Sequence, residues 1–177
     1  METANPIFRH QISADVIALD KQGRVVLVAD VRGSRVVKLT LSQFTSYLKA
    51  TQTVVPFAML ANPETIQIVQ WDGVNWSEAI CSLKTTDVVK PYIRDFDSYK
   101  RDDQNQQITG GYLETLLLAW LDDLAFHWKL ETPPASEVLA AMGLLERLNE
   151  GSTKREVEIS GDTILRDEFS HEYLHGA

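Results

Sequence analysis

Two apolar runs near the start of the chain are separated by a short polar turn. Residues 16–19 and residues 25–31 are mostly apolar, and the turn between them ends at Gly23. Short apolar runs around a glycine-containing turn are typical of a β-hairpin. Asp15 precedes the first run and Asp30 stands near the end of the second. Because antiparallel pairing brings those two ends together, we expect the two carboxylates to be neighbours.

The following stretch predicts a helix between two strands. Four apolar residues recur at steps of three and four, as on the buried face of a helix: Leu41, Phe44, Tyr47 and Leu48. Residues 54–60 have the composition of a buried strand, and residues 65–71 alternate as in an edge strand. Since a helix joins residues 25–31 to residues 54–60, we expect those strands to be parallel. The pattern predicts a mixed α/β fold.

The second half of the chain is predicted to be mainly helical. Residues 112–128 are apolar around most of a helix, so this helix is either central to the fold or packed against a partner subunit. A second helix is expected from Thr132 to Leu148, followed by a strand pair near the end. We therefore predict a core at residues 1–90, a polar connector at 91–111, and an appendage at 112–177 that packs on the core or forms a homodimer.

Three short motifs occur in an order that resembles the PD-(D/E)XK nuclease superfamily. Asp15 stands at the first acidic position, and Asp30-Val31-Arg32 follows on the next predicted strand, with arginine in place of the family's lysine. Gln43 and Tyr47 then match the Gln-x-x-x-Tyr spacing of an exonuclease branch of the superfamily. The resemblance covers roughly residues 13–73 and depends on the ordered combination, since no single motif is specific.

The resemblance implies a restriction-endonuclease-like core with a mixed four-stranded sheet, flanking helices and a metal-dependent active site. In such a site Asp15, Asp30 and the carbonyl group of Val31 hold Mg²⁺ or Mn²⁺, which activates water for phosphodiester hydrolysis. Arg32 in the lysine position can stabilise a phosphate but cannot accept a proton. The implied function is a nuclease with weakened or lost activity, or a non-catalytic interaction or regulatory module that keeps the nuclease fold.

Each candidate residue also has a structural interpretation. Asp30 and Arg32 share one strand face, so they can form a salt bridge that needs no metal. Lys38 either reaches the site with its amine or lies on the surface, and Gln43 and Tyr47 either contact the substrate or belong to the surface and core of their helix. The resemblance implies a further acidic ligand from a leading helix. The first 12 residues offer only Glu2 for it, and the alternative is that this ligand is missing or is supplied by another chain.

Charge and composition limit the possible partners. The chain has 177 residues, a net charge of −8 and a pI near 5.0, which disfavours extensive nucleic-acid binding because such binding depends on basic surfaces. Its single cysteine, Cys81, excludes an internal disulfide. The first residues do not have the pattern of a secretory signal, and no long uncharged apolar run occurs. We expect a cytoplasmic protein with no membrane association.

Overall fold

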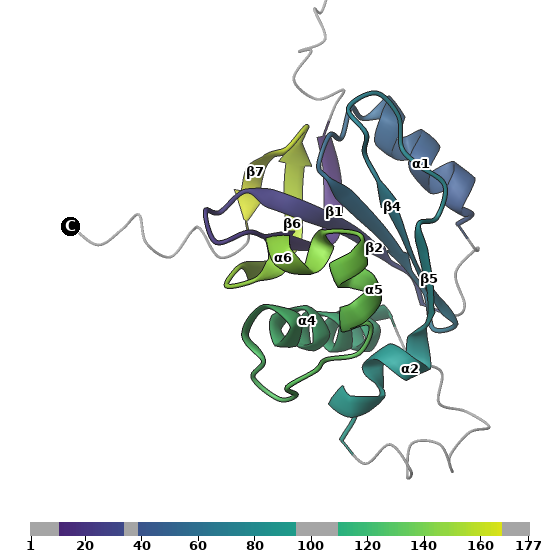
Figure 1. Ribbon diagram of the computed structural model, residues 1–177. Coiled ribbons are helices and arrows are strands. Elements are labelled where there is room, and N and C mark those ends of the chain that lie inside the picture. Colours follow the sequence, from purple (N-terminus) through teal and green to yellow (C-terminus); the bar gives the residue numbers. More distant parts are fainter. Residues whose placement is uncertain (1–10, 34–38, 95–109, 168–177) are drawn as a thin grey trace, which may run out of the picture.

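Figure 1 shows the computed structural model of the protein, which describes residues 11–33, 39–94 and 110–167. These residues form one mixed sheet of seven strands with helices on both faces. The strands are β1 (Gln11–Leu19), β2 (Val25–Val31), β3 (Phe57–Ala61), β4 (Thr65–Gln70), β5 (Cys81–Lys84), β6 (Ser152–Ser160) and β7 (Thr163–Asp167). The helices are α1 (Leu41–Ala50), α2 (Thr85–Val89), the short 3₁₀ helix η2 (Lys90–Tyr92), α4 (Gly110–Phe126), α5 (Ser136–Ala141) and α6 (Leu144–Leu148).

The predicted hairpin and crossover are confirmed. β1 and β2 are antiparallel, with Val16 opposite Ala29. The turn is held by the Asp20 carboxylate, which accepts the backbone N–H groups of Gln22 and Arg24. β2 and β3 are parallel, and α1 lies between them in the chain. The turn chemistry and the crossover therefore bring the end of β2 and the beginning of β1 to the same region of the molecule.

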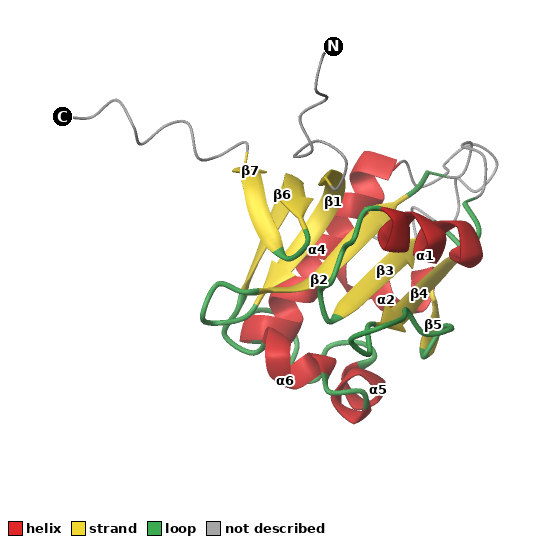
Figure 2. Cartoon of the chain, turned by 90° about the horizontal axis from the view of Figure 1, so that it is seen from above, coloured by secondary structure: helices red, strands yellow, loops and turns green. Residues whose placement is uncertain are grey.

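The sheet separates two hydrophobic cores. Figure 2 shows from above that α1 and α4 lie on opposite faces of the sheet. On one face, Phe44 and Leu48 of α1 pack on the sheet. On the other face, α4 contributes the completely buried side chains of Leu113, Leu117 and Trp120. Most of the apolar circumference of α4 is thus covered within one chain, with Tyr112 and Phe126 near its ends exposed, which confirms the alternative that this helix is central to the fold.

The sheet is larger than the four strands expected, and its order, β5-β4-β3-β2-β1-β6-β7, explains why. β6 pairs with β1 along most of its length, from Gln11 opposite Ser160 to Leu19 opposite Ser152. Part of the segment predicted as an appendage therefore extends the central sheet. The prediction of β4 as an edge strand is wrong, because β5 pairs with its other side.

One local prediction in the second half also differs from the structure. The helix expected from Thr132 to Leu148 is divided into α5 and α6 at Gly143, whose φ of 84° does not fit a helix. Before that segment, α2 and η2 follow β5 directly, and Val88 and Val89 are buried in the core to which α4 belongs. Among the described helices, none combines the length and apolar character that crossing a membrane requires.

Candidate metal centre

Asp15 lies at a distortion in the middle of the sheet. On one side of it, Ile12 and Ala14 face the α1 core, and on the other side Val16 and Ala18 face the α4 core. Regular strands keep alternate residues on one face. The alternation of β1 therefore shifts at Asp15, where its side chain leaves the regular pattern. Its Oδ2 atom accepts the backbone N–H of Val31 at 2.7 Å, which fixes the carboxylate against the end of β2.

Glu156 lies at the matching point of β6. The β1–β6 ladder continues on both sides, with Ala14 opposite Val157 and Val16 opposite Arg155, but it omits Asp15 and Glu156. Glu156 has a φ of 51°, in the left-handed region that costs a residue with a side chain about 1 kcal/mol. Both strands are thus distorted where these two acids meet, and β6 holds Glu156 in a conformation that strands normally avoid.

Glu114 approaches from the opposite direction, on the first part of α4. Its side chain is only 8% exposed, and its Oε1 accepts the Nε–H of Arg155 at 2.9 Å. Gly110, at the start of the same helix, lies against the backbone of Gly33, so the beginning of α4 is fixed close to the end of β2. The sequence did not single out Glu114 as a ligand. The sequence feature that could have identified Glu114 is the presence of an acid among leucines on an otherwise apolar helix face.

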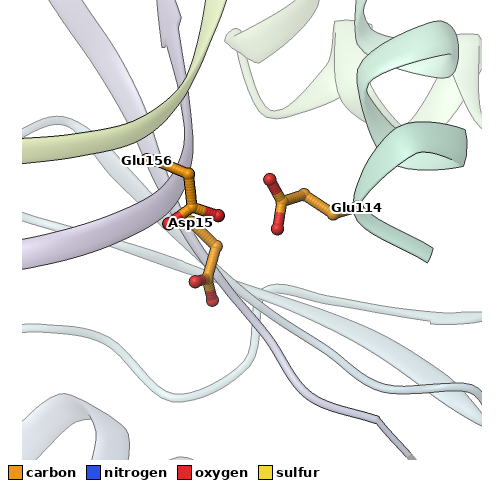
Figure 3. Close-up of side chains that lie close together, drawn as sticks. All are labelled: Asp15, Glu114 and Glu156. Carbon is orange, nitrogen blue, oxygen red and sulfur yellow. The ribbon is translucent and has the colours of Figure 1, made fainter. Parts of the chain in front are cut away.

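These three acids form one cluster. Each of Asp15, Glu114 and Glu156 offers a carboxylate oxygen within 4.8 Å of those of the other two. Figure 3 shows Glu114 extending from α4 toward the two strand residues. Oxygens on opposite sides of one Mg²⁺ lie about 4 Å apart, and those around Ca²⁺ about 5 Å apart. The spacing of these oxygens therefore fits one hard divalent cation, which would share the Glu114 carboxylate with Arg155.

The cluster changes the electrostatics of Asp15. Burial raises the pKa of its carboxyl group above the ordinary value of 3.8, and the hydrogen bond from Val31 opposes that change. The negative charges of Asp30 and Glu156 raise the pKa further, and Arg32 lowers it. Ionised Asp15 is therefore less favourable in the folded chain than in the unfolded chain, which is the condition that a bound cation relieves.

We expect Asp15→Asn to increase stability at neutral pH when no metal is present. A carboxyl group with a raised pKa binds more protons in the folded state, so its ionisation reduces stability as pH rises from about 3.8 through the folded-state pKa. The amide oxygen of asparagine can still accept the Val31 N–H. Thermal unfolding in the presence of a chelator checks this: the variant should unfold at a modestly higher temperature at pH 7, with the difference disappearing below pH 3.8. A lower unfolding temperature at pH 7 contradicts it.

Asp30 and Arg32 lie beside the cluster and bind one another. Nε of Arg32 donates to Oδ1 of Asp30 at 2.6 Å, and Nη2 donates to Oδ2 at 3.1 Å. Both carboxylate oxygens are therefore occupied by the guanidinium group. The structure brings Asp30 close to Asp15, as predicted, and at the same time forms the salt bridge that the sequence left as the alternative. Asp30 does not belong to the three-acid cluster.

An open cavity of about 450 Å³ adjoins the site. Asp15, Asp30, Val31 and Arg32 line one part of it, and Ser13, Leu39 and Tyr47 line the rest. The prediction that Tyr47 lies on the buried face of its helix is wrong, because Tyr47 is 45% exposed and lines this cavity. The side chain of Gln43 has a different role, because it accepts the N–H of Thr40 and completes the cap of α1. Lys38 and Glu2 lie outside the described residues.

Comparison of the chain with known proteins gives no family. Protein-family models, curated proteins and solved structures all fail to match it. The functional argument therefore rests on the geometry and chemistry of the cluster and the cavity.

Proposed function

We propose that this protein is a metal-dependent, nuclease-like protein that binds one or more divalent cations at Asp15, with phosphodiester groups as its substrate and low intrinsic activity. The observation that carries the proposal is the convergence of Asp15 with Glu114 and Glu156, from two strands and a helix, at 4.8 Å or less. Isolated acids on a surface do not require a distorted strand pair and a buried glutamate to bring them together.

The arrangement of elements supports a restriction-endonuclease-like core. An antiparallel hairpin, a helix and a parallel strand follow one another as β1, β2, α1 and β3, and Asp15 and Asp30 are neighbours at one end of the hairpin. This is the order that the resemblance to PD-(D/E)XK nucleases implies. In addition, Glu114 supplies a third acid from a helix, the role for which the first residues of the chain offered only Glu2.

The residues around the cavity have distinct chemical roles in this proposal. A divalent cation held by the carboxylates lowers the pKa of a bound water molecule and neutralises charge on a phosphate group. Arg32, fixed by Asp30 and lining the same cavity, is placed to bind a phosphate oxygen. Because guanidinium remains protonated, Arg32 cannot deprotonate the attacking water. The absence of that contribution is the physical reason for expecting low activity.

The test is a calorimetric titration with Mn²⁺ together with a cleavage assay. The wild-type protein should bind Mn²⁺, and Asp15→Asn should weaken binding at least tenfold, because a neutral amide is a poorer ligand for a hard cation. Asp72→Asn is the matched control: Asp72 lies in an exposed turn, where an asparagine oxygen can accept the same backbone N–H groups. Cleavage of end-labelled single-stranded and duplex oligonucleotides with Mn²⁺ should be lost in Asp15→Asn and retained in Asp72→Asn.

A second candidate function is a non-catalytic interaction module that keeps the nuclease fold. The bidentate contact between Asp30 and Arg32 favours it, since this pair holds the site together without a metal. The same experiment separates the two candidates. If the wild type gives no binding heat with Mn²⁺ and no cleavage, the nuclease proposal is contradicted and the module is favoured. Binding heat that is lost in Asp15→Asn supports the metal centre.

A further inference from the structure

The contact between Asp30 and Arg32 differs in kind from the contacts of Asp15. Both oxygens of Asp30 accept hydrogen bonds from Arg32, at 2.6 Å and 3.1 Å, in the parallel arrangement that guanidinium and carboxylate groups favour. Asp15, by contrast, accepts a backbone N–H from Val31 and lies among carboxylates. Two neighbouring acids at one end of a hairpin thus have different partners: a fixed cationic side chain for Asp30, and a cluster suited to a metal for Asp15.

A cation on Asp30 would compete directly with Arg32. Each carboxylate oxygen has a second lone pair that a metal ion could use, but both oxygens of Asp30 already accept guanidinium N–H groups, and a bound ion would weaken both hydrogen bonds. A metal ion and a guanidinium group on one carboxylate also repel each other in a partly buried position, since the Asp30 side chain is 18% exposed. The hydrogen bonds to Asp30 raise the pKa of Arg32, so its charge is permanent.

Arg32 nevertheless remains accessible from the cavity. Its side chain is 40% exposed, and it lines the cavity together with Asp15 and Tyr47. Only Nε and Nη2 bind Asp30, so the guanidinium group has further N–H donors for another ligand. The same cavity therefore adjoins a fixed positive charge on one side and a carboxylate of the three-acid cluster on the other.

We propose that Arg32 occupies the place of a second cation, so that the site binds one divalent metal ion, beside Asp15, and Arg32 supplies the other positive charge to an anionic group in the cavity. This inference rests on the proposed function, since it assumes that the cluster binds a metal. It predicts a definite stoichiometry for the wild type and a change of stoichiometry when the guanidinium group is removed.

The experiment is a titration with Mn²⁺ in which binding is measured by calorimetry and by the electron paramagnetic resonance signal of free Mn²⁺. Wild type should bind one ion per chain. Arg32→Ala and Arg32→Gln should each bind two, because the Asp30 carboxylate becomes available, and Arg32→Lys should bind one. Arg24→Ala is the control: it removes an arginine paired with another aspartate, Asp20, at 2.8 Å, at the hairpin turn, and should still bind one ion.

The possible failures are distinguishable. Two ions bound by the wild type, or one ion bound by both neutral Arg32 variants, overturn the inference and leave the metal centre at Asp15 intact. No ion bound by any of the variants or the wild type overturns both the inference and the proposed function. If only the neutral Arg32 variants bind an ion, and the wild type binds none, Arg32 does keep a cation away from Asp30, but the native chain has no metal centre and the proposed function is contradicted.

Discussion

Asp123→Ala is expected to lower the free energy of unfolding by about 2–4 kcal/mol, because the fully buried carboxylate of Asp123 accepts three hydrogen bonds. Its Oδ2 accepts the hydroxyl of Tyr92 at 2.6 Å, and its Oδ1 accepts the N–H groups of Lys129 and Leu130. Alanine removes the acceptor of these three hydrogen bonds. It also leaves a small void beside α4. Denaturant unfolding measures the effect.

Asp122→Ala is the matched control for this prediction. Asp122 is the preceding residue of the same helix, is half-buried, and accepts one side-chain hydrogen bond, from Thr153. Its replacement should cost about 1 kcal/mol. Tyr92→Phe should cost a similar amount, and the double variant with Asp123→Ala should be less destabilised than the sum of the two single changes. If Asp122→Ala and Asp123→Ala lower the free energy of unfolding equally, Asp123 has no special role in anchoring η2 to α4.

Gly151→Ala is expected to destabilise the protein by at least about 3 kcal/mol. A Cβ atom at this position would collide with the carbonyl oxygen of Leu19 and lie 3.0 Å from that of Leu148. Both obstacles are backbone atoms, so no side-chain rotation relieves them. Since Gly151 immediately precedes β6, the clash pushes the beginning of this strand away from β1, where Ser152 is opposite Leu19.

Gly111→Ala is expected to stabilise the protein, in contrast to Gly151→Ala. A Cβ atom at Gly111 meets nothing within 4 Å, and the residue lies in the first turn of α4. Alanine there should increase stability by about 0.5–1 kcal/mol, because it reduces the freedom of the unfolded chain. Thermal and denaturant unfolding of both variants check the pair. Similar stabilities for the two glycine variants contradict the close approach of Gly151 to β1.

Local patterns in the sequence predicted the part of the site that is local in the chain. Asp15 and Asp30 are joined by a short hairpin, so their proximity follows from the turn at Gly23 and from antiparallel pairing. The salt bridge between Asp30 and Arg32 follows in the same way, because the two residues share a strand face. These predictions needed only neighbouring residues, and the structure agrees with them.

The rest of the site depends on long-range pairing that periodicity does not encode. β6 could have paired with many strands, and nothing near Glu156 in the sequence indicates that its partner is β1. Glu114 is an acid on an apolar helix whose packing face becomes known only when the sheet is assembled. The same reason explains the wrong prediction for β4, since a strand is an edge or a central strand only in relation to the others.

The position of β1 between β2 and β6 has a consequence for protein synthesis. The hairpin and the crossover to β3 are complete at Ala61, but β6 begins only at Ser152. A chain still attached to the ribosome can form the early strands while one side of β1 remains open. The three carboxylates cannot come together until β6 has been synthesised, so any activity that depends on them is withheld from chains that stop before this strand.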